Sequence, residues 1–309
     1  MRNKRVLITG GLGFIGSHLS NELLKHNKVR IIDDLSTGNI KNIDNINDSK
    51  LEIIHEDLTK VDFDEITKDV HYIFHVAAMA NVFQCNEDPA RCNDINLNAT
   101  IRLLESAAKN NVKKVVFSSS SAVYGNNANL PLKETEKTNP ISPYGLSKAN
   151  CELYLKFFHN VYGLNYASLR YFNIFGQKQC LNGEYSAAIP NFILNLLNNK
   201  QVEIHGDGNQ TRDFIFIDDV VKANIKVCES EFNGIVNVAS GRELSINEIY
   251  ATIKDLLNSD LEPKYLAKRE NDIERSVADI NKMKKINLKA SQDDLKENLI
   301  KTIEWYKKN

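Results

Sequence analysis

The pair Tyr144 and Lys148 is the part of the chain with the clearest chemical potential. Their spacing puts both side chains on one face of a helix, and Ser142 and Pro143 suit the N-cap and first position of that helix. A phenol has an ordinary pKa of about 10, which a nearby ammonium group lowers by stabilising the phenolate. Tyr144 is therefore predicted to be a general base. Isolated pairs of this spacing also occur on many surface helices, so the prediction depends on the surrounding motifs.

A glycine-rich turn follows the apolar run 6–8 and opens another apolar stretch. Its glycines fit two registers, Gly11/Gly13/Gly16 and Gly10/Gly13/Gly16. Glycine has no Cβ to block a phosphate, and a helix that begins there offers free N–H groups and its positive dipole end. The turn predicts a site for a dinucleotide pyrophosphate. The alternative is a glycine-rich turn in an unrelated α/β protein.

An acidic residue supports the dinucleotide interpretation. The strand-like run 29–32 ends in Asp33 and Asp34. Asp33 lies ~20 residues beyond the turn, where a carboxylate accepts hydrogen bonds from an adenosine ribose. Because a carboxylate would repel a 2′-phosphate, the sequence favours NAD over NADP.

A hydroxyl-rich loop follows the apolar run 115–117, with serine at positions 118 to 121. Such a loop lies at the carboxyl edge of a parallel sheet, where ligands bind. A serine hydroxyl there can donate to a substrate oxygen that becomes a ketone. The alternative is a serine-rich turn that caps a helix.

Strand-like runs alternate with helical periodicity, which predicts an α/β protein with a parallel sheet covered on both faces. The runs are 6–8, 29–32, 51–54, 72–76, 115–117 and 166–169. The alternation weakens near Asn173. The later runs 214–217 and 235–238 are candidates to return to the sheet, and 218–219 to begin a helix.

Composition excludes several classes of partner. The 309 residues carry a net charge of −1 with both signs interspersed, which predicts no nucleic-acid and no anionic-membrane partner. The apolar run behind the basic start breaks at Thr9, too short for a signal peptide or a membrane span, so a cytoplasmic location is expected. Five cysteines without a C-x-x-C pair indicate reduced, buried thiols, and the seven histidines show no metal-ligand spacing.

Taken together, these motifs resemble the extended short-chain dehydrogenase/reductases, and specifically the UDP-glucose (UDP-hexose) 4-epimerase family. The resemblance covers essentially the whole chain. Its further landmarks are Asp57 in 56–58, the run 75–78, Asn96 in 95–98, the run 170–176 and the run 206–214.

This resemblance implies a Rossmann-type doubly wound parallel sheet with a smaller C-terminal α/β lobe that binds the substrate. The expected NAD-binding domain is 1–173, with return segments at about 213–240. The expected nucleotide-sugar-binding lobe is 174–212 and 241–309.

The resemblance also implies roles for individual residues. Tyr144 would be the base, Lys148 would hold the nicotinamide ribose and lower the pKa of Tyr144, and Ser120 would bond the sugar O4. The residues implied to bind NAD are Gly10, Gly13, Phe14, Ile15, Gly16, Asp33, Asp57, Leu58, Ala77, Ala78, Asn96, Ser118, Tyr144, Lys148 and Tyr171. Those implied to bind the UDP-sugar are Ser120, Tyr144, Asn173, Ala188, His205, Arg212, Arg269, Asp272 and Ser276.

Within the substrate set, Asn173, Arg212 and Arg269 would hold the diphosphate, and Asp272 would lie near the ribose or sugar. Guanidinium groups suit a diphosphate because their forks match phosphate oxygens and stay charged. For Arg212 and Arg269 the alternative is ordinary surface charge. His205 stands where relatives often stack an aromatic ring on uracil.

The reaction class is narrowed by a residue type that the serine loop lacks. Dehydratases and decarboxylases of the family place an acidic residue there, whereas 120–122 is Ser-Ser-Ala. Oxidation at C4 is then followed by return of the hydride to the opposite face, which inverts C4. The alternatives are a nucleotide-sugar decarboxylase or 4-reductase, and a non-catalytic NAD-sensing protein. An intact set of Ser120, Tyr144 and Lys148 favours catalysis.

Two finer expectations concern sugar range and assembly. The resemblance puts Ser276 beside the sugar C2 substituent, where a small residue leaves room for an acetamido group; alternatively, Ser276 caps a helix that begins at 279–280. The segments 97–108 and 148–158 carry apolar residues on more than one face, which predicts a symmetric homodimer with a four-helix contact. These residues are Leu97, Ile101, Leu104, Ala108, Cys151, Leu155 and Phe158, and the alternative is deeper burial within one chain.

Overall fold

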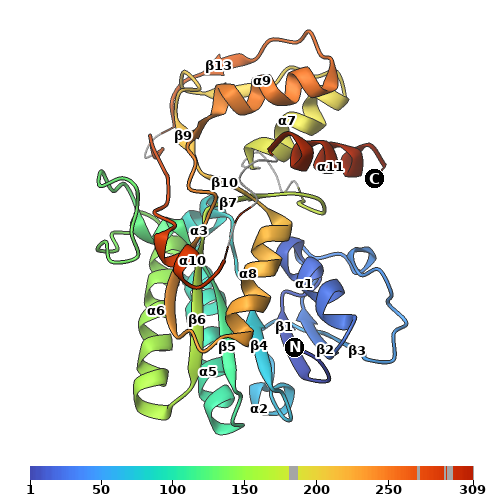
Figure 1. Ribbon diagram of the computed structural model, residues 1–309, viewed down its shortest axis with the longest axis vertical. Coiled ribbons are helices and arrows are strands. Elements are labelled where there is room, and N and C mark those ends of the chain that lie inside the picture. The colour runs from blue at the N-terminus through green and yellow to red at the C-terminus, as the bar shows by residue number, and fades with distance from the viewer. Residues whose placement is uncertain (181–186, 270–271, 289, 291–294, 309) are drawn as a thin grey trace.

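The main architectural feature of the computed structural model, which describes residues 1–180, 187–269, 272–288, 290 and 295–308, is a seven-stranded parallel sheet (Figure 1). Its strand order is β11-β6-β5-β4-β1-β2-β3. The strands are β1 (Arg5–Thr9), β2 (Lys28–Asp33), β3 (Leu51–His55), β4 (Tyr72–His75), β5 (Lys114–Ser120), β6 (Asn165–Tyr171) and β11 (Gly234–Val238). The order reverses between β1 and β4, the kind of point where α/β proteins bind ligands. The predicted Rossmann-type doubly wound α/β fold is confirmed.

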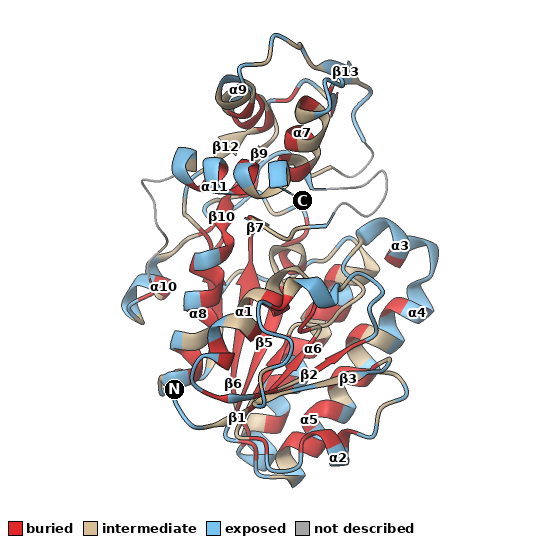
Figure 2. Cartoon of the chain, turned by 90° about the vertical axis from the view of Figure 1, so that its right-hand side faces the viewer, coloured by how far each residue is buried: buried red, intermediate tan, exposed pale blue. Residues whose placement is uncertain are grey.

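Helices cover both faces of this sheet, so the inner strands β1, β4, β5 and β6 are near-continuous buried runs, whereas the edge strand β3 is only partly buried (Figure 2). Val6 and Ile8 pack with α1 (Phe14–Leu24) and α8 (Ile217–Glu229), whereas Leu7 between them packs on the opposite face. The opposite face is covered by α2 (Phe63–Ile66), α5 (Ala99–Lys109) and α6 (Pro143–Tyr162). Alternate residues of one strand therefore belong to two separate cores.

A smaller lobe lies beyond the carboxyl ends of the strands (Figure 1). Its elements are α7 (Ala188–Leu197), β8 (Glu203–His205), β9 (Thr211–Arg212), β12 (Leu244–Ser245), α9 (Ile246–Leu257), β13 (Lys264–Leu266) and α11 (Leu295–Lys308). β8 pairs with β13, and β9 pairs with β12. The shorter helices before this lobe are η1 (Ile40–Asn42), α3 (Val82–Glu87), α4 (Pro89–Asn93), η2 (Asp94–Asn98) and η3 (Ser121–Tyr124).

The chain passes between the two parts more than once. β7 (Asn173–Phe175) pairs in parallel with β10 (Phe214–Phe216), so the run 214–217 does not join the main sheet. The run 235–238 does return, as β11 beside β6. Between β13 and α11 of the smaller lobe, α10 (Asn281–Lys285) packs against β11 of the main sheet. The proposed domain limits stay a prediction.

The helix that carries the tyrosine–lysine pair begins as the sequence predicts. Ser142 is the N-cap of α6, and its hydroxyl accepts a hydrogen bond from the Gly145 N–H at 3.1 Å. Pro143 occupies the first position, where a missing N–H costs nothing. Gly163 ends the helix in the left-handed conformation, with φ 71°. Tyr144 and Lys148 therefore lie in its first two turns.

A buried ion pair fixes this helix to the sheet. Glu152 of α6 and Arg170 of β6 are joined by two hydrogen bonds, of 2.6 and 3.0 Å, and both are almost completely buried. The same carboxylate accepts from the Ser119 hydroxyl at 2.7 Å, and the guanidinium lies 4.7 Å from the centre of the Tyr124 ring. Removing one partner of such a pair costs ~3–5 kcal/mol, because the other charge is left buried and unpaired.

Two of the composition-based expectations can be compared with the structure. Four cysteines are buried as free thiols, but Cys180 is exposed, so the expectation of five buried thiols is wrong at that position. Cys180 follows β7 in the chain and belongs to neither hydrophobic core. Among the helices of the described residues, none is both long and apolar enough to cross a membrane.

Candidate active site

A cavity of about 950 Å³ opens where the carboxyl ends of the strands meet the smaller lobe. It is bordered by residues of β5, α6, β7, α7, β8 and β9. Eight of the nine predicted substrate residues line it: Ser120, Tyr144, Asn173, Ala188, His205, Arg212, Arg269 and Asp272. Phe14, Ile15 and Tyr171, predicted to bind the cofactor, line it too. The fold thus brings residues from distant parts of the chain into one chamber.

The glycine turn forms a cradle that leaves no room for side chains. A Cβ on Gly16 would lie 1.9 Å from the Gly10 carbonyl oxygen, and one on Gly10 would lie 2.9 Å from the backbone of Ala77. Gly10 also has φ 66°, which favours glycine. Gly13 is the N-cap of α1 and supplies no side-chain cap, so the first N–H groups of the helix are left for a ligand. The cradle therefore fits a dinucleotide pyrophosphate.

Two carboxylates stand at the carboxyl ends of the neighbouring strands. Asp33 ends β2 and accepts hydrogen bonds from the N–H groups of Leu12 and Leu35, at 2.9 and 2.8 Å. Its burial raises its pKa. Asp57 follows β3 and accepts from the Arg91 guanidinium at 2.7 Å. Asp33 is thus tied directly to the glycine turn, and contact of either residue with adenosine stays a prediction.

Several of the other predicted cofactor residues use their polar atoms inside the chain. Asn96 is buried and pairs with Met79 twice, through its amide oxygen at 2.8 Å and its amide nitrogen at 3.1 Å. The Ser118 hydroxyl donates to the Tyr171 hydroxyl at 3.3 Å, which donates to Asn224 at 2.9 Å. Leu58 is a core residue and Ala77 packs partly against the same core. Of these residues Tyr171 borders the cavity, and direct contact with the cofactor stays a prediction for all of them and for Ala78.

The predicted catalytic residues lie together. The Tyr144 hydroxyl is hydrogen-bonded to Ser120, whose Oγ also accepts from the Ala122 N–H at 3.1 Å. Lys148 is fully buried behind them, and its Nζ donates to the Ser118 carbonyl oxygen at 2.7 Å. That ammonium lies 5.8 Å from the centre of the Tyr144 ring.

Burial shifts the pKa values of Tyr144 and Lys148 in opposite directions. Desolvation of the Tyr144 hydroxyl raises its pKa to about 12, although the hydrogen bond from Ser120 opposes the rise. Desolvation also lowers the pKa of Lys148 to about 8. In the protein without its ligands, desolvation of the phenol thus outweighs the hydrogen bond from Ser120, and the lowering of the Tyr144 pKa by Lys148 stays a prediction. A bound cationic ring beside the phenol would act in the lowering direction.

The far end of the cavity carries the predicted diphosphate residues. Arg212 of β9 is paired with Asp272, with 2.6 Å between Nη2 and Oδ1, and its Nη1 donates to the Ile273 carbonyl oxygen at 2.6 Å. Burial lowers the pKa of Arg212 and Asp272 opposes that effect. Arg269 borders the same cavity from an exposed position. Both guanidinium groups thus face the cavity, and their contact with a diphosphate stays a prediction.

Ser276 differs from the other predicted substrate residues, because it is buried and does not border the cavity. It lies between Arg275, which bridges to Thr211, and Ala278, which bridges to Leu132. The helix-capping alternative is wrong: α10 begins at Asn281, and no side chain caps it. The serine therefore stands just behind the wall near Arg212.

Further polar residues border the cavity that the sequence did not single out. They are Gln179, Asn191, Asn195, Lys200, Gln201 and Glu203. They come from α7, β8 and adjoining loops, where polar side chains are ordinary. No spacing in the sequence distinguishes them, since only the packing of the smaller lobe turns them inward. Elsewhere, the described residues contain no cluster of His, Cys, Asp and Glu suited to a metal ion.

The glycine cradle, the Ser-Tyr-Lys set and the adjoining polar chamber define the class of short-chain dehydrogenase/reductases. The match with the NAD dependent epimerase/dehydratase family extends over residues 6–239. The chain belongs to this family.

Individual relatives agree with this assignment. A putative UDP-glucose 4-epimerase of Methanocaldococcus jannaschii is 42% identical over 308 residues, which cover 98% of this chain and 99% of that protein. Among solved structures, a UDP-N-acetylglucosamine 4-epimerase from Methanobrevibacter ruminantium in complex with UDP-N-acetylmuramic acid is 49% identical, with a TM-score of 0.98 and coverage of 100% and 99%. A Thermus thermophilus UDP-glucose 4-epimerase complex with NAD is 30% identical, with a TM-score of 0.89 and coverage of 98% and 99%.

The position of Lys148 predicts a change in pH dependence. Replacing it by Met removes the ammonium that favours the Tyr144 phenolate, so the pKa of that phenol rises and the acid limb of the kcat profile moves to higher pH, by ~1–3 units. Lys148→Arg keeps the charge and should restore much of the profile. Activity is measured against pH for all three proteins. Coinciding acid limbs for the wild type and Lys148→Met would contradict this role.

Proposed function

We propose that the chain is an NAD-dependent UDP-sugar 4-epimerase that interconverts UDP-glucose and UDP-galactose. The observation that carries the proposal is the hydrogen-bonded pair of Ser120 and Tyr144 on the cavity wall, with Lys148 behind it and the glycine cradle beside it. The family membership and the activities named for the relatives support it. A cytoplasmic location, as expected from the sequence, suits an enzyme of nucleotide sugars.

The side chains suggest how C4 would be handled. Tyr144 takes the proton of the C4 hydroxyl, and Ser120, within reach of the same oxygen, donates a hydrogen bond to it as it becomes a ketone. NAD, when bound in the cradle, supplies the capacity to accept a hydride from C4 and to return it. Tyr144 then gives the proton back. A hydride returned to the opposite face leaves C4 inverted.

The arrangement of charged groups favours epimerisation over the related eliminations. The loop from Ser120 through η3 to Tyr124 contains no carboxylate that could remove the C5 proton. Arg212 and Arg269 stand at the opposite end of the cavity, where they suit the diphosphate. Holding the nucleotide there while leaving the sugar unclamped lets the 4-keto ring turn about its phosphate linkage.

The role of the base is tested by Tyr144→Phe, which removes the proton acceptor and keeps the ring. We expect turnover of UDP-galactose to fall by ~100-fold or more, the usual scale for losing a general base. Binding of NAD and UDP should persist, because the glycine cradle and the cavity wall around Arg212 are unchanged. Turnover is followed by separating the UDP-hexoses, and binding by calorimetry.

Four results would contradict the proposal. Wild-type turnover in Tyr144→Phe would remove the base from the mechanism. Stoichiometric consumption of a reduced nicotinamide would indicate a 4-reductase, and release of CO₂ from UDP-glucuronate would indicate a decarboxylase. Absence of turnover on every UDP-sugar, with NAD bound, would favour the sensing protein.

The finer proposal on sugar range concerns Ser276. We propose that the enzyme also interconverts UDP-N-acetylglucosamine and UDP-N-acetylgalactosamine. Ser276 is small and buried behind the cavity wall near Arg212. The wall residues in front of it can therefore shift to make room for an acetamido group.

Replacing Ser276 by Tyr tests this range by adding bulk at that wall. Turnover of the N-acetylhexosamines should be lost while UDP-galactose is still converted. Ser276→Ala, which adds no bulk, is the control and should keep both activities. Equal loss on both substrates would make the residue structural, and a wild type inactive on N-acetylhexosamines would end the claim.

The finer proposal on assembly is a symmetric homodimer formed through α6. Several of the residues named for this contact, Leu104, Cys151, Leu155 and Phe158, are instead buried within the chain, so the alternative holds for them. The exposed apolar face of α6 consists of Leu146, Leu153, Phe157 and Val161, between 47% and 66% exposed. Neighbouring large apolar residues on one long helix are unusual at a free surface, and a second copy would cover them.

The dimer is tested by Leu153→Glu, which puts a charge at the centre of that face. We expect light scattering at micromolar concentration to give a dimer mass for the wild type and a monomer mass for the variant. Ile300→Glu on α11, where an apolar residue is 41% exposed, is a matched control that should stay dimeric. A monomeric wild type would contradict the proposal.

A further inference from the structure

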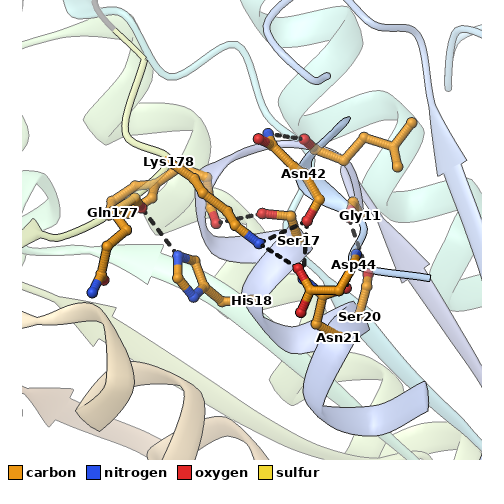
Figure 3. A network of polar contacts seen from close by, with 11 residues as sticks. Gly11, Ser17, His18, Ser20, Asn21, Asn42, Asp44, Gln177 and Lys178 are labelled. Atoms are coloured by element: carbon orange, nitrogen blue, oxygen red, sulfur yellow. Dashed lines mark hydrogen bonds and ion pairs between the residues drawn. The ribbon is translucent and has the colours of Figure 1, made fainter. Parts of the chain in front are cut away.

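Residues 176–179 follow β7 on the way to the smaller lobe, and they contact α1 and the loop after β2 (Figure 3). We call this segment the crossing strap. Lys178 Nζ donates to the Asn42 carbonyl oxygen at 2.7 Å and lies 3.3 Å from a carboxylate oxygen of Asp44. His18 Nε2, on α1, donates to the Gln177 carbonyl oxygen at 3.0 Å. None of these contacts is needed by the chemistry at C4.

The structure that Lys178 holds is the loop after β2, residues 34–44, which we call the adenosine-side loop. Within it, the Asn42 amide and the Asn39 N–H both donate to the Leu12 carbonyl oxygen, at 2.9 and 3.0 Å. Leu12 lies in the glycine turn, and its own N–H binds Asp33. The loop, the turn and the residue expected to bind the ribose are thus one hydrogen-bonded unit.

The loop is held from two sides. On the inner side, Asn21 of α1 donates to the Asn42 carbonyl oxygen at 2.9 Å and accepts from the Asp44 N–H at 3.0 Å. On the outer side, the Lys178 ammonium reaches that same Asn42 oxygen from the crossing strap. α1 belongs to the cradle itself, whereas the strap leads into the substrate lobe. Lys178 is therefore the contact through which that lobe touches the adenosine-side loop in this network.

The backbone at Lys178 is strained. Its φ is 64°, a left-handed conformation that a lysine adopts only when surrounding contacts hold it there. Its side chain is only 15% exposed, although the carboxylate that it approaches is 75% exposed. A lysine that merely covered the surface would need neither the strain nor the burial. The strain is offset by the charge-assisted hydrogen bond to the loop.

We propose that Lys178 is a positioning residue that latches the adenosine-side loop against the glycine turn and so slows release of NAD. The inference rests on the proposed function only in taking NAD as the ligand of the cradle. A 4-keto intermediate can be reduced again only if the reduced cofactor stays bound beside it. Slow release of NAD is therefore more useful here than fast exchange. The latch also connects retention of NAD with the substrate cavity, because Gln179, the next residue of the crossing strap, borders that cavity.

The latch is tested with Lys178→Met, which keeps the aliphatic stem and removes the ammonium. Protein loaded with NAD is freed of excess cofactor by rapid gel filtration, and the NAD that stays bound is followed over time. We expect release about 10- to 100-fold faster than from the wild type, the factor that a charge-assisted hydrogen bond is worth. Lys178→Arg can still reach the carbonyl oxygen and should slow release again. Lys41→Met removes an exposed lysine from the same loop and should release NAD at the wild-type rate.

A second measurement uses the cofactor-free protein. Amides of the adenosine-side loop should exchange hydrogen faster in Lys178→Met, whereas those of β1, β4 and β5 should exchange as in the wild type. Wild-type release and loop exchange in Lys178→Met would overturn the latch and leave the proposed function intact, as would faster exchange throughout the sheet, which would indicate general destabilisation. A wild type that binds no NAD would overturn the proposed function, and the latch with it.

Discussion

The geometry of the active site depends on the buried pair of Glu152 and Arg170. Glu152 stands one helical turn beyond Lys148, and its carboxylate also receives the hydroxyl of Ser119. Ser119 in turn lies between the residue that accepts from Lys148 and the residue bonded to Tyr144. The Glu152 carboxylate therefore fixes the position of α6 along the end of β5. Both charges are desolvated, so another register of helix and strand would leave a buried charge unpaired. That would lower the stability of the fold strongly.

The two ends of the cavity are built from different kinds of structure. The end with Ser120 and Tyr144 is built on the first turn of a helix and on the end of a strand inside a seven-stranded sheet. The end with Arg212 is built on two-stranded pairs and loops of the smaller lobe, and Asp272 holds that arginine. A catalytic set on elements of a large sheet keeps its reacting groups in a fixed geometry.

The sequence predicted the chemistry of local motifs better than the positions of isolated residues. The glycine turn, the strand that ends in Asp33 and the capped helix of Tyr144 are each defined by neighbours in the chain, so spacing was enough to predict them. The cavity-lining residues Asn195 and Lys200 lack such a signature, because only the packing of the smaller lobe turns them inward. The same limit applies to α6: periodicity finds an apolar helix, but only the fold decides that Leu155 faces the core and Leu153 faces out. The rise in the pKa of Tyr144 likewise comes from burial, which is a property of the fold.

That raised pKa has a consequence for the protein in the cell. A phenol with a pKa of about 12 is neutral at physiological pH and therefore a weak nucleophile. Without its ligands the protein therefore presents a protonated phenol to the cavity. A bound cationic ring acts in the opposite direction and lowers the pKa of that phenol. Burial of Tyr144 thus makes its strength as a base depend on the presence of the cofactor.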